Sequence, residues 1–501
     1  MDHSSRRRFL AALGIGTTAG LAAACTDEAG PDGSGGPAST STSTTTRPAV
    51  IPEVPPDPGL ASDPFTLGVA SGDPLPTAVM LWTRLAPAPE SDDGGVPDGD
   101  HGVLWEVATD ESFTDVVAAA VATAPGDTAH AVRVDAQGLQ PSSWYHYRFR
   151  IGDWTSPVGR TRTAPASGSD EPVDFGFASC QSFQSGWYNA WSDVAASELD
   201  LVVFLGDYIY ENASRTVDPT EGVVRPLGAG NDEPECTTLA DYRRRYAIDR
   251  SDEKLRAAHA AAPWLVIWDD HEVDNNYAGL SSESEQVGTE EFTERRTAAY
   301  RAWWENMPVR LDPPEGPDLR IDRTVEWGSL ANFFLIDSRQ YRDDQECGDA
   351  TLDVGPACDG ADDPSREFLG EAQHARLVEG LTNSGATWNV IGNQTVMSRL
   401  TVGDAILNYD QWDGYPAARD RLLEAIEAAG LTNTVVITGD IHVAGVADVQ
   451  LGDGDDARTV ATELVGTSIS SGSPIPEDLT DLVSTLLPWI RYFAARRGWT
   501  R

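Results

Sequence analysis

The amino-acid sequence contains little positive charge. Its 501 residues include 36 lysines and arginines against 79 aspartates and glutamates, a formal net charge of −43. This excess of negative charge repels nucleic acid and anionic lipid, so we expect no partner with a phosphate backbone. An anionic substrate would need local positive charge, from metal ions or from a few arginines. Lys254, the only lysine, follows no glycine-rich loop, which argues against a Walker-type phosphate loop and a Schiff-base lysine.

Cysteine and histidine are scarce as well. The five cysteines are an odd number, which in an exported chain leaves at least one sulfur outside disulfides. Cys347 and Cys358 flank a short loop rich in glycine and aspartate, and they are a possible disulfide. Of the eight histidines, only His271 and His442 follow predicted strands at the positions expected for ligands, so an all-histidine zinc site is excluded.

The first 25 residues are typical of an export signal. Arginines at positions 6–8 precede Phe9-Leu10 and a run of alanine, glycine and leucine that is too short for a comfortable membrane span. The paired arginines resemble a twin-arginine signal, which predicts export by the twin-arginine machinery. Leu21–Cys25 resembles a lipoprotein cleavage site with Cys25 acylated; the alternative is ordinary cleavage with a stray cysteine. Residues 26–60 are predicted to be a flexible linker, so the rest of the chain would lie outside the cytoplasm and touch a membrane only through a lipid anchor.

Residues 61–165 are predicted to form a separate all-β domain. Four short strands lie between turn-rich stretches, at Val79–Trp82, Val103–Val107, Ala131–Val134 and Trp144–Arg150. The last strand follows Leu139-Gln140-Pro141, a pattern like the tyrosine corner of fibronectin-type sandwiches. We therefore expect a fibronectin- or immunoglobulin-like β-sandwich in which no residue has an obvious chemical role.

Residues 166–501 are predicted to form an α/β domain, because strands alternate there with helices. The helices are expected at Trp187–Ser197, Leu239–Ile248, Lys254–Ala262, Phe292–Met307, Ala372–Thr382 and Ala417–Ala429. Leu199–Leu205 is an almost unbroken apolar run that suits a strand buried on both faces. It ends in Gly206-Asp207, and ligands of α/β proteins bind beyond the carboxyl ends of such strands. The alternative is that Asp207 caps a helix.

Five further apolar strands end in polar residues in the same way. They are Phe175–Ala178 before Cys180, Trp264–Trp268 before Asp269-Asp270-His271-Glu272, Phe333–Ile336 before Asp337-Ser338-Arg339, Trp388–Ile391 before Asn393, and Val435–Thr438 before Asp440 and His442. Chance would produce one or two such strands. Six of them predict a common site at one end of the domain.

The side chains at these strand ends fit a centre of two metal ions. A shared carboxylate, for which Asp207 is the natural choice, would hold two ions about 3.5–4 Å apart. Oxygen donors suit Ca²⁺, Mn²⁺ or Mg²⁺, whereas the thiol of Cys180 and the phenol of Tyr210 suit a more strongly acidic ion such as iron. The alternatives are a plain buried thiol for Cys180 and a packing aromatic for Tyr210. Asp269 is expected to be a structural cap rather than a ligand.

Several of these segments resemble the PhoD-type alkaline phosphatase/phosphodiesterase family of the calcineurin-like metallophosphoesterases. The matching pieces, in order, are FTLGVASGDP (65–74), FASCQ (177–181), GDYIYE (206–211), WDDHEVDNNY (268–277), DSRQYRD (337–343), WDGYP (412–416) and TGDIH (438–442). The resemblance covers the chain from about residue 65 to its end. It implies a two-sheet αββα catalytic core behind the N-terminal domain.

The resemblance also implies the residues of a binuclear or larger metal centre. An Fe³⁺ site would be formed by Cys180, Asp207, Tyr210 and His442. A neighbouring Ca²⁺-type site would be formed by Asp207, Asp270 and Asp440, with Mn²⁺ or Zn²⁺ as substitutes. His271 would contact the leaving-group oxygen or the phosphate, and Asn276 and Arg339 would touch the phosphate.

The C-terminus departs from the family pattern. The family continues beyond an Arg-Gly-aromatic segment, here Arg497-Gly498-Trp499, into a further β stretch, whereas this chain stops at Arg501. This difference leaves open whether the edge of the second sheet is closed. It also leaves open whether a C-terminal helix covers the metals. Either the chain is truncated or the lid is reduced.

The sequence is therefore interpreted as an exported, monomeric, metal-dependent phosphoester hydrolase. A metal-bound hydroxide would attack phosphorus in line, so no side-chain nucleophile is assigned. Small phosphoesters or lipids are the expected substrates. A phosphodiesterase or phospholipase D-like activity on diesters is the alternative. A non-catalytic, metal-stabilised surface binding protein is a remote alternative, against which the six strand ends argue.

Overall fold

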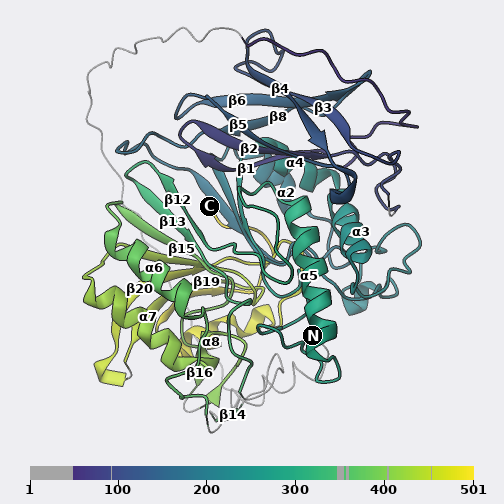
Figure 1. Cartoon of the computed structure of the whole chain (residues 1–501). Helices are drawn as coiled ribbons and strands as arrows, with labels where there is room; N and C mark the ends of the chain where they lie inside the picture. Colours follow the sequence, from purple (N-terminus) through teal and green to yellow (C-terminus); the bar gives the residue numbers. More distant parts are fainter. Residues whose placement is uncertain (1–48, 92, 347–354, 357–359, 403–404, 453) are drawn as a thin grey trace.

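The computed structural model describes residues 49–501 except 92, 347–354, 357–359, 403–404 and 453 (Figure 1). Cys25, Cys347 and Cys358 lie outside the described residues, so lipidation and the disulfide stay predictions. In the described ranges, each predicted strand and helix is present, with ends shifted by a few residues. No helix in these ranges is both long enough and apolar enough to cross a membrane.

The first of two large sheets contains the strand that leads to Asp207. Its order is β5 (Ala131–Gln137), β2 (Ala78–Arg84), β1 (Val69–Leu75), β11 (Trp264–Ile267), β10 (Leu201–Leu205) and β9 (Phe175–Ala178). β9, β10, β11 and β1 run parallel; β2 pairs antiparallel with β1, and β5 pairs antiparallel with β2. Every residue of β10 is buried, as expected for its apolar run.

The N-terminal β-region is not separate from this sheet. A further sheet contains β3 (His101–Ala108), β4 (Val116–Ala124), β6 (Trp144–Ile151), β7 (Trp154–Thr155) and β8 (Gly159–Arg162). It packs on β1, β2 and β5 around buried residues such as Val79 and Tyr147. However, β1 also pairs with β11 through Gly72 and Trp264. A Cβ atom at Gly72 would lie 2.4 Å from the carbonyl oxygen of Pro308, so this close approach requires glycine.

The expected self-contained sandwich is therefore not confirmed, because one of its two layers continues into the sheet that leads to Asp207. One detail of that expectation does appear. The hydroxyl of Tyr145 accepts a hydrogen bond of 2.8 Å from the backbone amide of Gln140, as in a tyrosine corner.

The second large sheet leads to Asp440 and His442. Its order is β12 (Arg323–Trp327), β13 (Ala331–Leu335), β15 (Trp388–Gly392), β18 (Thr434–Thr438), β20 (Arg458–Val465), β19 (Ala444–Leu451) and β21 (Ile490–Ala494). β13, β15, β18 and β20 run parallel. A small sheet is formed by β14 (Gly355–Pro356), β17 (Ala405–Ile406) and β16 (Thr401–Val402).

Alternate residues of the second sheet face opposite ways. Phe333, Leu335 and Ile437 belong to the core shared with the first sheet, whereas Phe334 and Val436 face the other side. That other side is covered by α6 (Glu371–Asn383) and α7 (Pro416–Ala428), and α2 (Asn189–Ala196) and α4 (Glu253–Ala261) pack on the first sheet (Figure 1). In the part of the chain that the structure describes, the remaining α-helices are α3 (Leu239–Arg250), α5 (Thr289–Asn306) and α8 (Thr480–Leu486). The mixed α/β fold is confirmed, with parallel strands of both sheets ending near one another.

The C-terminal segment links the two large sheets. β21 forms the edge of the second sheet, the edge whose closure was in question, and Thr500 then pairs with Phe177 of β9. Trp499 occupies the space that a side chain at Gly176 would need, because a Cβ atom there would lie 2.6 Å from the indole. The last residues of the chain therefore contact both sheets.

Candidate metal centre

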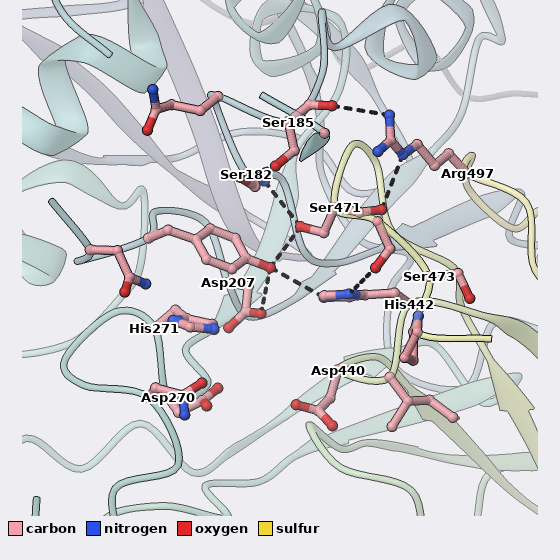
Figure 2. Close-up of a pocket in the computed structure, with 18 of the residues that line it drawn as sticks. Ser182, Ser185, Asp207, Asp270, His271, Asp440, His442, Ser471, Ser473 and Arg497 are labelled. Carbon is pink, nitrogen blue, oxygen red and sulfur yellow. Dashed lines mark hydrogen bonds between the residues drawn. The ribbon is translucent and has the colours of Figure 1, made fainter. Parts of the chain in front are cut away.

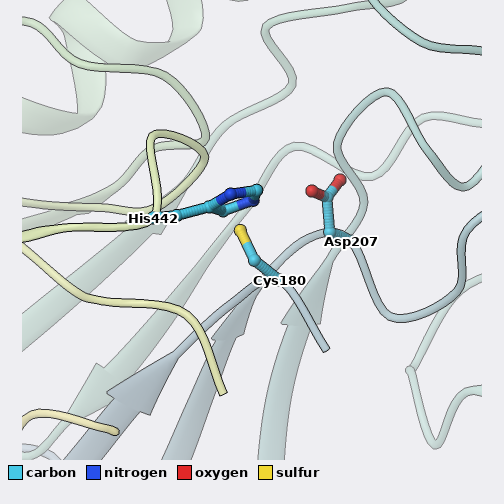
Figure 3. A group of neighbouring side chains, drawn as sticks. All are labelled: Cys180, Asp207 and His442. Carbon is cyan, nitrogen blue, oxygen red and sulfur yellow. The ribbon is translucent and has the colours of Figure 1, made fainter. Parts of the chain in front are cut away.

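Three predicted ligands from different strand ends lie together. Cys180 follows β9, Asp207 follows β10 and His442 follows β18, and each offers a ligand atom within 4.8 Å of the others (Figure 3). The hydroxyl of Tyr210 donates a hydrogen bond of 2.9 Å to Asp207 and lies 3.3 Å from Nε2 of His442. These four residues, which we call the thiol group, are the ones that the resemblance assigns to Fe³⁺.

The backbone determines which nitrogen of His442 faces the thiol group. Nδ1 lies 3.0 Å from the carbonyl oxygen of Gly472, so Nδ1 carries the proton and Nε2 keeps a free lone pair. Burial lowers the pKa of His442 to about 4, which keeps the imidazole neutral. A neutral imidazole with Nε2 free is the form that binds metal ions.

A second cluster consists of carboxylates only. Asp269 and Asp270 follow β11, and each offers an oxygen within 4.8 Å of the other and of Asp440; we call these three residues the acidic group. Asp207 also lies within this distance of Asp270 and His271, so it adjoins both groups. A carboxylate in this position suits a pair of bridged ions. Asp269, expected as a structural cap, is one of these three carboxylates.

Left-handed backbone conformations direct the side chains at these strand ends. Cys180, Asp207, Asp440 and His442 have φ angles of 60°, 59°, 65° and 58°. Such conformations cost non-glycine residues roughly 1–2 kcal/mol each and concentrate at functional sites. Glu272 offsets part of the cost, because its buried carboxylate accepts a hydrogen bond of 2.9 Å from the amide of Asp207.

Arg339 lies beneath the acidic group and does not line the cavity. Its fully buried guanidinium donates from Nε to Asp269 at 2.5 Å and from Nη1 to Asp410 at 2.8 Å. Its Nη2 lies 3.4 Å from Asp270 and 3.7 Å from Asp440. The side chain thus balances part of the acidic charge. The contact of Arg339 with phosphate stays a prediction.

The two asparagines considered from the sequence lie in different environments. Asn276 lines the cavity, and its backbone amide donates a hydrogen bond of 2.7 Å to Asp270. Asn393 is buried against Trp412, whose indole nitrogen donates to its Oδ1 at 3.3 Å, and it does not line the cavity. Asn276 therefore adjoins the acidic group, and Asn393 supports the second sheet.

His271 is held by a residue that the sequence analysis did not assign. Its Nδ1 lies 2.7 Å from a carboxylate oxygen of buried Glu211, and its ring lies 4.1 Å from that of Tyr210. Burial opposes the charged imidazole, but Glu211, followed by Asp207 and Asp270, raises the pKa of His271 well above its usual value. Nε2 is therefore the nitrogen available to a substrate. Glu211 stands at the end of GDYIYE, so the motif contained the signal for it.

The surroundings of Cys180, Asp207 and Tyr210 disfavour the negatively charged forms of these side chains. Burial, together with acidic neighbours, raises the pKa values of Cys180, Asp207 and Tyr210 well above their usual range. Among the residues that the structure describes, one oxygen of Asp207 and one of Asp270 are buried without a hydrogen-bond partner. Buried charges are costly unless they are paired or coordinate a metal. The donor set therefore fits metal ions.

Both groups open into one cavity of about 1420 Å³ (Figure 2). One wall is polar and includes Ser182, Ser471, Arg215 and Arg497. Another is apolar and includes Leu400, Leu407, Ile475, Val483, Leu486 and Phe493. The sequence analysis assigned a role to none of these residues, because no recognised motif contains them apart from the Arg497 segment.

Two face-to-face sheets that deliver thiol, phenol, imidazole and carboxylates to one rim define a metallohydrolase. Residues 175–497 match the family model of the PhoD-like phosphatases, and residues 52–165 match the model of that family's N-terminal domain. The chain belongs to the PhoD-like phosphatase family.

Known proteins agree with this assignment. Alkaline phosphatase D of Bacillus subtilis strain 168 is 43% identical over 452 residues, which cover 89% of this chain and 76% of that protein. A solved structure of PhoD has a TM-score of 0.83 at 42% identity and covers 88% of this chain and 85% of its own. Purple acid phosphatase PPD1 from yellow lupin seeds shares the fold alone, with a TM-score of 0.50, 11% identity and coverage of 86% and 68%. The resemblance is confirmed, and the chain is a metal-dependent phosphoester hydrolase.

Proposed function

We propose that this enzyme hydrolyses phosphoesters at a mixed centre, with Fe³⁺ at the thiol group and a Ca²⁺-type ion between Asp207, Asp270 and Asp440. Mn²⁺ or Zn²⁺ could substitute. The observation that carries this proposal is the position of Asp207, which adjoins a thiol, a phenol and an imidazole on one side and a carboxylate on the other. Soft and phenolic donors suit iron, and carboxylates suit calcium.

When bound, such ions polarise phosphoryl oxygens and lower the pKa of water. The residues of the chain then orient the substrate. Glu211 holds Nδ1 of His271, which leaves Nε2 to donate a proton to the leaving-group oxygen. Asn276 lies beside Asp270 at the cavity wall, where its side chain would contact the phosphate. Arg339 would act from beneath, by holding the carboxylates of the acidic group.

A second candidate function is the hydrolysis of phosphodiesters, including phospholipase D-like activity. The observation that favours it is the apolar wall of the cavity, formed by residues such as Leu407, Val483 and Leu486. A diester carries a second alcohol moiety, which this apolar wall could bury. Such burial stabilises the complex by about 25 cal/mol per Å² of apolar surface. A small monoester would leave this wall in contact with water.

Assays on a chromogenic monoester and a chromogenic diester, each with and without a chelator, test these functions. We expect hydrolysis that the chelator abolishes and that added metal ions restore. The ratio of kcat/KM for the two substrates decides between monoesterase and diesterase. Absence of turnover on both substrates with metal bound would favour the non-catalytic binding protein.

We also propose the cellular context from the sequence. Residues 1–25 would direct export by the twin-arginine machinery, and Cys25 would be acylated, with residues 26–60 as the linker to the enzyme. Each acyl chain contributes about 0.8 kcal/mol per buried CH₂ to membrane binding. The N-terminal region would comprise residues 61–165 and the catalytic domain residues 166–501, in a monomer. Mass spectrometry of the mature N-terminus tests lipidation, and an unmodified start beyond Cys25 contradicts it.

A further inference from the structure

Ser471 contacts two members of the thiol group from a loop that follows β20. Its side chain is 3% exposed, and its Oγ lies 2.7 Å from the hydroxyl of Tyr210 (Figure 2). The same Oγ donates a hydrogen bond of 3.0 Å to the carbonyl oxygen of Cys180. One hydroxyl thus adjoins residues that come from β9 and β10 of the first sheet.

The backbone next to Ser471 contacts the thiol group as well. The amide of Ser471 donates to the carbonyl oxygen of Cys180 at 3.3 Å. The carbonyl oxygen of Gly472 lies 3.0 Å from Nδ1 of His442 and sets its tautomer. Ser471 and Gly472 therefore contact three of the four candidate ligands, which are Cys180, Tyr210 and His442. The fourth, Asp207, accepts a hydrogen bond from Tyr210.

The C-terminal segment holds Ser471 in place. Its carbonyl oxygen accepts hydrogen bonds from the hydroxyl of Ser468 at 2.7 Å and from Nε of Arg497 at 3.1 Å. Nη1 of Arg497 donates to the carbonyl oxygen of Ser185 at 3.0 Å, on the loop that follows Cys180. Arg497 thereby joins the Ser471 loop to the Cys180 loop.

The geometry points to Ser471 as a positioning residue for the ion at the thiol group, an inference that rests on the proposed metal centre. Because the hydroxyl of Tyr210 donates to Asp207, its oxygen is free to accept a further hydrogen bond. The hydroxyl of Ser471 lies 2.7 Å from that oxygen and 3.0 Å from the carbonyl oxygen of Cys180, so it can donate to either one. Ser471 would thereby fix the direction in which the Tyr210 oxygen faces a bound ion.

The test compares Ser471→Ala with Ser470→Ala in the full-length metal-loaded enzyme. Ser470 is a matched control, because it is equally buried on the same loop but its hydroxyl donates to the carbonyl oxygen of Ser182. Residues that orient metal ligands typically change metal affinity or activity about 10–100-fold. We expect the metal affinity of Ser471→Ala, measured by competition with a chelator, to fall by a factor in that range. The metal affinity of Ser470→Ala should match that of the wild type.

A second readout is the visible band expected for a phenolate bound to Fe³⁺. Loss of the hydrogen bond to the phenolate should move this band to longer wavelength in Ser471→Ala, and Ser471→Thr, which keeps the hydroxyl, should restore it. Arg497→Gln should weaken metal retention in the same direction. Equal chelator resistance of Ser471→Ala and Ser470→Ala would overturn the inference whichever metal is bound. Metal retention is measured without substrate, so failure of the proposed reaction would be seen separately in the phosphoester assays.

Discussion

The thiol group and the acidic group lie side by side, yet the protein stabilises them differently. In the thiol group, neutral partners orient the ligands: the carbonyl oxygen of Gly472 faces His442 and the hydroxyl of Ser471 faces Tyr210. In the acidic group, a buried cation, Arg339, contacts the carboxylates directly. The first group therefore depends on geometry, and the second on charge balance. Asp207 connects them.

This difference has a chemical consequence. Thiol, phenol and imidazole donors have directional lone pairs, so their orientation decides which ion they hold. Carboxylates tolerate varied coordination geometry, as Ca²⁺ sites show, but several of them together need positive charge. Two neighbouring sites built on these two principles suit two different ions.

Replacement of the connecting residue should have the largest effect. We expect Asp207→Asn to reduce kcat/KM by more than the roughly 10–100-fold that loss of a ligand-orienting residue costs, because both ions lose a ligand. The free energy of unfolding of Asp207→Asn should fall far less than its kcat/KM. Steady-state kinetics and thermal unfolding measure the two effects. Asp337→Asn is a matched control, since Asp337 is a buried strand-end aspartate outside both groups. Wild-type turnover in Asp207→Asn would refute a shared ligand.

Replacement of His271 should slow catalysis without removing either of the two proposed ions. We expect His271→Gln to lower kcat by about 10²–10⁴-fold, the usual range for a general acid, with the larger losses on esters of poor leaving groups. Glu211→Gln should show the same trend with a smaller loss, because Nδ1 keeps a hydrogen-bond partner. Rates for a series of aryl phosphoesters with graded leaving groups provide the measurement. A loss independent of the leaving group would assign His271 to phosphate binding.

Variants of residues within one group should remove the ion of that group and leave the other ion bound. Cys180→Ser is expected to weaken iron retention, and Tyr210→Phe to bleach or shift the visible band, with the ion at the carboxylates retained. Asp270→Asn should do the reverse. Element analysis and absorption spectra of the three purified variants test this. A band that Tyr210→Phe leaves unchanged would favour a packing role for Tyr210.

A buried carboxyl outside both groups should have the smallest effect on catalysis, and it should act on the stability of the fold instead. Burial raises the pKa of Asp249 to about 7 from its usual 3.8, although the hydroxyl of Tyr188 donates to it. The folded chain then keeps a proton that the unfolded chain releases. Between these two pKa values, stability should therefore fall as pH rises, by up to about 1.4 kcal/mol per pH unit.

Asp249→Asn should remove this contribution without altering metal retention. Urea unfolding midpoints across the acidic to neutral range, compared with the wild type, measure it. If the dependence of stability on pH is the same in Asp249→Asn and in the wild type, Asp249 is ionised in the folded protein.

Local sequence patterns predicted the strands, the helices and most candidate ligands. The run Leu199–Leu205 followed by Asp207 is visible without knowledge of the fold, because burial on both faces demands apolar residues. The position of Arg339 was not visible, since it depends on Asp410, 71 residues away along the chain. The pairing of Gly72 with Trp264 depends likewise on a distant partner, so the continuous sheet was not predicted.

Small residues that act through hydrogen bonds were the hardest to predict. Ser471 stands in a stretch of serines and glycines with nothing to distinguish it from Ser470. Its role follows from the C-terminal segment and from the loop after β9, which the chain brings together only in three dimensions. The role of a single serine therefore has to be inferred from its contacts in the fold and not from the local sequence.

Element analysis of purified wild-type enzyme and Asp207→Asn tests the central claim most directly. The account predicts two different ions per wild-type chain, iron and a calcium-type ion, and loss of both in Asp207→Asn while Asp337→Asn keeps both. Retention of both ions by Asp207→Asn, or a wild-type centre that contains a single kind of ion with full activity, would contradict it.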